Sequence, residues 1–319
     1  MKKCVLVLLV MLLACGGVFA QAKIKIGVSM PAAMAGFMGG ATWWAKKAID
    51  DWTKKDPSLE FYFVAAENVT KQASDLEDLV VKGIKSLCVF PYDASLTSVI
   101  EKIYNKGIYT VVLDRGTTKP VYDVWLRNDD EGYATQGMEQ VCKLLGYKGN
   151  VVVLEGVPSP INTIRVDMIK AVAAKYTGIT ILDSQPAYWN RQKALEVMVN
   201  YLQKYPKIDA LYTADDDMLM GGLQAYKESG RKDLKVAVGG ACMKELVKKI
   251  MDGSDPLIKV DVTYPPDVLA TGVSLAVVGV KGRVFEGFYQ KKLPVRIILA
   301  SELVTKENAK DYYHPDSPF

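Results

Sequence analysis

The chain has 319 residues, half of them hydrophobic, and a formal net charge of only +4. That length can bury one large or two ordinary cores, and the small charge, with no run of five or six like charges, argues against a nucleic-acid binder. A single histidine, His314, leaves almost no scope for histidine-based catalysis or for zinc.

Residues 1–20 have the pattern of an export signal. Two lysines precede an apolar run at residues 5–14, which is too short to span a membrane, and small residues follow. Two processing routes stay open. We favour signal peptidase cleavage after Ala20, because the alternative, a lipobox that leaves Cys15 acylated, gives only a short tether before the first strand. Both routes predict a periplasmic or otherwise extracytoplasmic protein.

From residue 23 onward, short β-rich runs alternate with amphipathic segments of helical length. Most of the runs are continuously apolar, which is typical of strands in a parallel sheet covered on both faces. The alternation predicts an α/β fold with doubly wound parallel sheets. The predicted strands lie at residues 23–30, 60–66, 86–91, 109–114, 150–156, 179–185, 209–214, 234–240 and 258–264.

The pattern divides into two halves. The first set of strands ends near Asp114, residues 121–132 look like a crossing, and a second set begins at Asn150. Two doubly wound halves create a cleft, and such sheets bind ligands beyond the carboxyl ends of their strands. The residues that directly follow each strand are therefore the candidates for ligand binding.

In the first half, three strand ends carry such candidates. Phe37 and Met38 lie on a glycine-containing loop and could present an apolar face to a ligand, or simply pack within the loop. Phe90 follows the third strand. Asp114 and Arg115 follow the fourth strand. The carboxylate of Asp114 is an acceptor beside the planar set of donors on Arg115, and this pair suits the binding of vicinal hydroxyls. The alternative is a simple ion pair on the surface.

In the second half, Arg165 opens a helix and Trp189 follows a strand. A large aromatic side chain at the end of a strand is suited to stacking on the face of a sugar ring. The alternative is that Trp189 belongs to the hydrophobic core of the domain. Thr263 ends the last predicted strand, where the chain would return to the first half.

Three consecutive carboxylates, Asp215, Asp216 and Asp217, stand between a strand and a helix. We expect Asp215 to accept hydrogen bonds from a ligand, Asp216 or Asp217 to cap the helix, and the third to stay solvated. Calcium is the weaker alternative, because consecutive residues lack the alternate-position spacing of a calcium loop.

Other chemistry finds little support. No nucleophile–base–orienter set can be assembled, so we predict no catalytic residues, no cofactor and no metal, and a protein that is not an enzyme. Cys88, Cys142 and Cys242 form no metal pattern and are expected to be small buried hydrophobes, with one disulfide as the alternative.

Five segments together carry a family resemblance: IKIGVSMP after an export signal, VVLDRG, SQPAYWNRQKALEVM, DALYTADDDMLMGGLQA and DVTYPPDVLATGV. On these the chain resembles the type I periplasmic binding proteins of sugar ABC transporters, the ribose-binding-protein-like family, over residues 23 to about 303. The resemblance implies two doubly wound lobes joined by a three-segment hinge and closing on a monosaccharide. It places the N-terminal lobe at residues 23–127 plus 264–298 and the C-terminal lobe at 128–263 plus 299–319.

The family's ligand contacts fall on residues already singled out from the strand ends. The matching positions are Phe37 or Met38, Asp114, Arg115, Arg165, Trp189, Asp215 and Thr263. Two positions depart from the family: Phe90 stands where asparagine is frequent, and the run Gly240-Ala241-Cys242 lacks a hydroxyl-binding aspartate. The lost contacts disfavour a pyranose hexose and favour a deoxy sugar, a pentose, a polyol or a furanose-like ligand.

The resemblance also implies the partners: a small sugar or polyol and a membrane permease, with no nucleic acid, for a protein expected to be a monomer. The alternative function is sensing, in which the protein presents a sugar or an autoinducer-2-like furanose to a chemoreceptor or a sensor kinase. A transcriptional repressor of the same fold is excluded, because an export signal stands where its DNA-binding domain would be.

Overall fold

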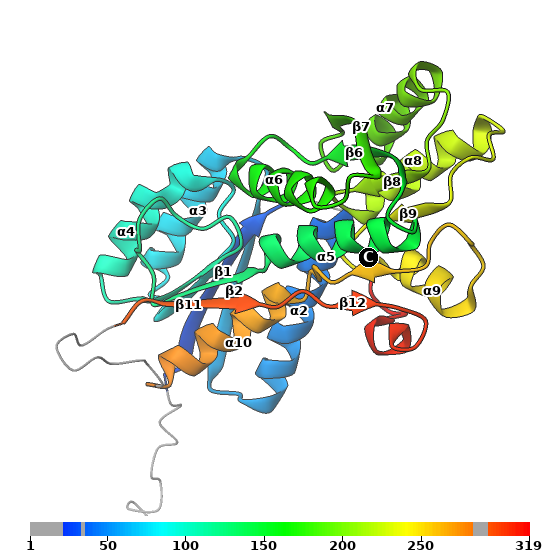
Figure 1. Cartoon of the computed structure of the whole chain (residues 1–319). Helices are drawn as coiled ribbons and strands as arrows, with labels where there is room; N and C mark the ends of the chain where they lie inside the picture. The colour runs from blue at the N-terminus through cyan, green and yellow to red at the C-terminus, as the bar shows by residue number, and fades with distance from the viewer. Residues whose placement is uncertain (1–21, 33–35, 283–292) are drawn as a thin grey trace, which may run out of the picture.

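The computed structural model describes residues 22–32, 36–282 and 293–319. The predicted export signal and Cys15 therefore lie outside the described residues. Two parallel sheets with flanking helices make up the molecule (Figure 1), so the predicted α/β class is confirmed.

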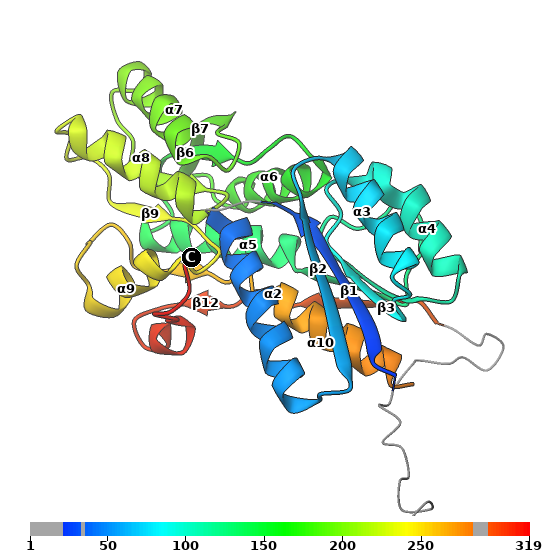
Figure 2. The same cartoon turned by 180° about the vertical axis from the view of Figure 1, so that it is seen from behind.

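The first sheet has six parallel strands in the order β11-β5-β4-β3-β1-β2. Helices α2 and α10 cover one face, and α3 and α4 cover the other (Figures 1 and 2). The strands are β1 (Ile24–Pro31), β2 (Leu59–Ala66), β3 (Ser86–Val89), β4 (Tyr109–Leu113), β5 (Val124–Asn128) and β11 (Val295–Leu299), and the helices are α2 (Gly36–Lys55), α3 (Val69–Val81), α4 (Thr97–Asn105) and α10 (Val268–Val280).

Strand β4 shows why these segments read as continuous apolar runs. Val111 and Leu113 point into the core under α2 and α10, whereas Val112 points into the core under α3 and α4. All three side chains are fully buried. A strand buried on both faces has no polar side to alternate with, which is the reason for the unbroken hydrophobic pattern.

The second sheet has four parallel strands in the order β7-β6-β8-β9. Helices α5 and α6 pack together in front of it in Figure 1, and α7 and α8 pack together on its other side, towards the viewer in Figure 2. The elements are β6 (Gly149–Glu155), β7 (Ile179–Pro186), β8 (Ala210–Thr213), β9 (Val236–Val238), α5 (Asp130–Leu144), α6 (Pro160–Ala174), α7 (Arg191–Lys204), α8 (Asp216–Glu228) and α9 (Lys244–Asp252).

Three segments connect the two sheets. The chain passes from β5 to α5, from β10 (Asp261–Val262) to α10, and from β11 to β12 (Leu303–Val304). Strands β10 and β12 pair antiparallel and form a small third sheet beside these connections.

Two expectations from the sequence are wrong here. Residues 258–264 do not add a strand to a parallel sheet, because only Asp261 and Val262 pair, and they pair antiparallel with β12. Residues 121–132 are not simply a crossing, because Val124–Asn128 form β5 between β4 and β11 of the first sheet. The crossing follows that strand.

The three cysteines in the described part of the chain are free. Cys88 and Cys142 are buried, as expected of small hydrophobes, whereas Cys242 is partly exposed. The alternative of a disulfide is therefore not realised. Across the described residues, no helix combines the length and the apolar character needed to cross a membrane.

Candidate ligand-binding site

Strained backbone conformations gather at the carboxyl ends of the strands. Six non-glycine residues in the described chain have positive φ, and five of them lie within four residues after the end of β4, β7 or β9. Such conformations are costly and tend to mark functional sites. These five residues are Asp114, Tyr188, Trp189, Ala241 and Cys242.

Contrary to expectation, Arg165 does not open its helix but lies inside α6, where charge and aromatic rings hold it in place. Only 5% of it is exposed, its Nε donates to Asp130 Oδ1 at 2.9 Å, and its Nη1 donates to the carbonyl of Ala214 at 3.0 Å. Its guanidinium carbon lies 4.5 Å from the ring centre of Tyr133 and 4.3 Å from that of Tyr264. The guanidinium is thus fixed before any ligand arrives.

The side chains of Asp114 and Arg115 contact different parts of the structure. Asp114 is 7% exposed and accepts a hydrogen bond at Oδ2 from the Tyr264 hydroxyl at 2.9 Å. Burial, together with the charge of Asp130, raises the pKa of Asp114. The exposed Arg115 instead donates to the carbonyl of Tyr92 and lies over the Phe90 ring, 5.3 Å from its centre.

The aromatic and apolar candidates occupy three environments. Phe37 and Met38 lie in the first turn of α2, so the expectation of a loop is wrong. Phe37 is partly buried and its ring centre lies 6.0 Å from that of Tyr264. Met38 packs against the core under α2, and Phe90 is almost fully buried in the same core. Trp189 is partly buried against the core of the second sheet.

The three aspartates divide their roles differently from our expectation. Asp215, and neither of the next two, is the N-cap of α8: its Oδ1 accepts from the Met218 N–H at 2.8 Å. Asp217 is paired with Arg191 at 2.9 Å. The expected cap at Asp216 or Asp217 is therefore wrong, because the helix begins one or two residues earlier than those assignments require.

Asp216 is fully buried rather than solvated. Its two carboxyl oxygens accept from the N–H groups of Gly240 and Met243, each at 2.7 Å. Burial and the neighbouring Asp261 carboxyl raise the pKa of Asp216. Since Asp261 is also fully buried and accepts from Val262 and Cys242, the two carboxyls together fix the turn after β9.

Asp215 remains partly exposed at the carboxyl edge of the second sheet. Burial raises its pKa to about 7, the charge of Asp217 acts in the same direction, and Arg165 and Arg191 oppose it. The capping bond uses Oδ1.

Thr263 serves the connection between the sheets. Its hydroxyl accepts from the Glu302 N–H at 2.8 Å, and its own N–H donates to the Glu302 carbonyl at 2.9 Å. The next residue, Tyr264, points the other way and contacts Asp114, Arg165 and Phe37.

The structure therefore brings Phe37, Asp114 and Arg165 together around Tyr264, with Asp215 near enough for Arg165 to influence its pKa. It does not bring Arg115, Phe90, Thr263 or Trp189 into that cluster through any contact described above. Sequence reasoning missed Tyr264, Tyr133 and Asp130. Only Tyr264 carried a signal, since neighbouring side chains in an extended segment point to opposite sides.

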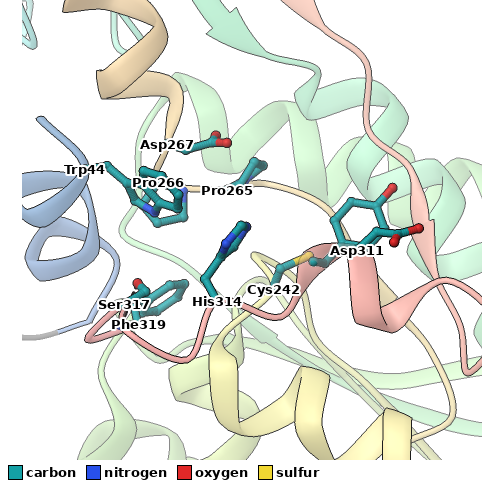
Figure 3. Close-up of a pocket in the computed structure, with 10 residues that line it drawn as sticks. Trp44, Cys242, Pro265, Pro266, Asp267, Asp311, His314, Ser317 and Phe319 are labelled. Carbon is teal, nitrogen blue, oxygen red and sulfur yellow. Dashed lines mark hydrogen bonds between the residues drawn. The ribbon is translucent and has the colours of Figure 1, made fainter. Parts of the chain in front are cut away.

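A separate cavity of about 210 Å³ lies between α2, residues 265–267 and the C-terminal segment (Figure 3). Its lining includes Trp44, Cys242, Pro266, Asp267, His314 and Phe319. None of the residues predicted to bind a ligand lines it, so it is distinct from the cluster around Tyr264.

Comparison with known proteins decides the family. A family model described as the periplasmic binding protein domain matches residues 26–278, which is most of the chain. The chain belongs to the periplasmic binding protein family. Its fold is that of the type I members, and the resemblance seen in the sequence is confirmed.

Curated relatives of this periplasmic binding protein are themselves binding proteins. A xylitol-binding protein of Mycolicibacterium smegmatis is 32% identical over 195 residues, which cover 60% of this chain and a little over half, 56%, of that protein. A putative rhizopine-binding protein of Rhizobium meliloti is 26% identical over 84% of this chain and 86% of its own. The D-allose-binding periplasmic protein of Escherichia coli is 29% identical over 73% and 78%.

Solved structures share the fold at lower identity. A solute-binding protein of Bacillus halodurans with bound myo-inositol has a TM-score of 0.79 at 21% identity, covering 93% of this chain and 99% of that one. One of Mycobacterium smegmatis with bound glycerol has a TM-score of 0.78 at 24% identity, covering 92% and 98%. At these identities the likeness concerns the fold alone.

Proposed function

We propose that this chain is the extracytoplasmic substrate-binding protein of an ABC importer and captures a small polyol or monosaccharide between two lobes. The lobes are those predicted from the sequence, residues 23–127 plus 264–298 and residues 128–263 plus 299–319. Relatives named for xylitol and D-allose, and related folds with bound myo-inositol and glycerol, support a polyhydroxylated ligand.

One observation carries the proposal: the chain of contacts from Asp114 through Tyr264 to Arg165. Asp114 directly follows β4 of the first sheet and Arg165 lies on α6 beside the second, so charged groups from both sheets meet at one hinge residue. Hydrogen bonds to charged groups contribute about 1.5–3 kcal/mol each, which suits the binding of neutral hydroxyls.

Capture would work by closure. In this proposal a ligand donates hydrogen bonds to Asp114 on one lobe and to Asp215 on the other, and stacks on Trp189. It can make all these contacts only when the lobes approach each other. Binding therefore shifts the population to the closed form. In this proposal Phe37 and Met38 close the site from the first lobe, and Phe90 and Arg115 shape its edge.

A thermal-shift screen of the mature protein tests the binding function. We expect at least one of xylitol, glycerol, D-ribose, D-allose and myo-inositol to raise the melting temperature, since a ligand at 100 times its Kd stabilises the native state by about 2.7 kcal/mol. Trp189→Ala should abolish that shift in a variant that is less stable but still unfolds cooperatively. A screen without any shift for sugars and polyols would overturn the proposal.

Sensing is the second candidate function. It is suggested by one structural neighbour, the fructose-binding periplasmic domain of a hybrid two-component system, with a TM-score of 0.75 at 22% identity over 90% of this chain. Uptake of the identified ligand by cells with and without the chain separates the two candidates. A transport role predicts lost uptake, whereas a purely sensory role predicts normal uptake and a lost transcriptional or chemotactic response.

Export and assembly complete the proposal. Intact-mass measurement of the secreted protein distinguishes cleavage after Ala20 from a lipid-modified N-terminus at Cys15. Light scattering of the mature protein is expected to give the mass of a monomer.

A further inference from the structure

Tyr264 occupies the hinge end of the proposed site. It lies between β10 and α10, only 6% of it is exposed, and its hydroxyl donates to Asp114 Oδ2 at 2.9 Å. The two neighbouring residues cannot do this, because Thr263 bonds to Glu302 and Pro265 carries no polar side-chain group.

The hydrogen bond limits what Asp114 can offer a ligand. A carboxylate offers about four lone-pair sites on its two oxygens, and Tyr264 already takes one of those on Oδ2. Fewer acceptor sites of Asp114 therefore remain for ligand hydroxyls. This suits a ligand that presents few hydroxyls to this end of the site.

The Tyr264 ring also fills space. Its face lies 4.3 Å from the guanidinium carbon of Arg165, and its centre lies 5.4 Å from that of Tyr133 and 6.0 Å from that of Phe37. The rings of Tyr133 and Tyr264 meet at 73°, an edge-to-face contact that fixes both.

The turn after β9 leaves room for this arrangement. A Cβ on Gly240 would lie 2.1 Å from the Tyr133 hydroxyl oxygen, so only glycine allows Tyr133 to occupy that place. The hydroxyl donates to the Ala214 carbonyl at 3.1 Å. The Tyr133 ring thus stands beside the turn at which the family resemblance expects a hydroxyl-binding aspartate.

We infer that Tyr264 is a specificity-determining residue: its ring shortens the site at the hinge and its hydroxyl occupies one acceptor site of Asp114, so that ligands of pentose size or smaller are selected over hexoses and cyclitols. This inference rests on the proposed function, because it concerns the ligand of that same site.

The test is calorimetric binding of glycerol, xylitol, D-ribose, D-allose and myo-inositol to the mature wild-type protein, to Tyr264→Leu and to Tyr264→Phe. The wild type should bind its best ligand of five carbons or fewer at least about tenfold more tightly than D-allose or myo-inositol, the factor expected for a size difference in a closed pocket. Tyr264→Leu removes the ring and should reduce that ratio by about tenfold or more. Tyr264→Phe keeps the ring but loses the bond to Asp114, so the ratio should fall, by less than it falls in Tyr264→Leu.

Tyr201 offers a matched control. It is 2% exposed, donates to the Val153 carbonyl at 3.0 Å and lies in the core of the second sheet. Tyr201→Phe and Tyr201→Leu should leave the ligand ratio unchanged, whatever they cost in stability. Unfolding curves identify any variant that does not fold, and the Phe variant keeps the ring packing if the Leu variant fails.

The outcomes are distinct. A wild type that binds no member of the panel contradicts the proposed function and this inference together. A wild type that binds hexoses or cyclitols as tightly as pentose-sized ligands, or a ratio that Tyr264→Leu leaves unchanged, overturns the inference while the proposed function stands.

Discussion

The indole of Trp189 lies directly against the backbone of Gly156. A Cβ built on Gly156 would be 2.3 Å from the indole nitrogen, and Trp189 itself has a positive φ of 51°. Gly156 follows β6 and Trp189 follows the neighbouring strand β7, so two strand ends fix one ring. The ring can hold this position only while residue 156 has no side chain.

Gly156→Ala is therefore expected to displace Trp189 and weaken ligand binding. The loss should be about tenfold, the effect of misplacing one contact worth about 1.4 kcal/mol. A double-mutant cycle with Trp189→Leu is the measurement, by calorimetry. If Gly156 acts through the indole, the two changes are not additive. Full additivity would show that the glycine acts by another route.

Ligand affinity should rise with pH around neutrality. Burial raises the pKa of Asp215 to about 7, so the carboxylate that we propose accepts a ligand hydroxyl is a minority form at pH 6 and the major form at pH 8. Since apparent affinity scales with the competent fraction, we expect about a tenfold gain over that interval. Calorimetry at both pH values measures it.

Asp215→Asn is the matching variant, because an amide oxygen can still cap α8 but does not titrate in this range. It should bind with nearly the same affinity at pH 6 and pH 8. A pH dependence equal to that of the wild type would exclude Asp215 as its source.

Stability should depend on pH through the Asp216 and Asp261 pair. Burial raises the pKa of Asp216 in the folded protein above its value in the unfolded chain. Below the unfolded-chain pKa, Asp216 makes its full contribution to the free energy of unfolding. That contribution is lost as the pH rises towards the pKa in the folded protein. One proton contributes a slope of about 1.4 kcal/mol per pH unit. Urea unfolding from pH 4 to pH 8 measures that slope.

Asp261→Asn should flatten this slope, because an amide can donate to Asp216 without a titrating proton. Asp183→Asn is the control, since hydrogen bonds hold the pKa of Asp183 at about 2, below the window. An equal flattening in both variants would contradict the assignment to the buried pair.

Arg165→Met should lower the free energy of unfolding by about 3–5 kcal/mol, because it leaves the buried Asp130 carboxylate without its closest cation. Arg191→Met is the matched control. Its partner Asp217 is 20% exposed and Arg191 itself 46%, so the change should cost less than about 1 kcal/mol. Similar losses in the two variants would mean that Arg165 is not buried as described.

The strands could be predicted wherever local pattern was sufficient. Eight of the nine predicted runs form strands of the two parallel sheets, because burial on both faces produces an apolar run that is visible locally. Strand β5 was missed because polar Arg127 and Asn128 interrupt it, and β10 was misassigned because its partner β12 lies far away along the chain.

The three aspartates show the same difference between what the sequence predicts and what only the folded structure decides. The sequence predicted that three adjacent carboxylates between a strand and a helix must separate their charges, but not which residue takes which role. Successive helical residues point about 100° apart, so the residue at which α8 begins decides that Asp215 caps, Asp216 is buried and Asp217 meets Arg191.

By itself, the sequence determined the α/β class, the family resemblance and the strand ends at which ligand contacts were to be sought, because these follow from hydrophobic periodicity and local motifs. Only the tertiary structure decided that Tyr264 rather than Thr263 faces Asp114 and Arg165. That choice depends on Glu302, which engages both the N–H and the hydroxyl of Thr263 and so turns its neighbour towards the site.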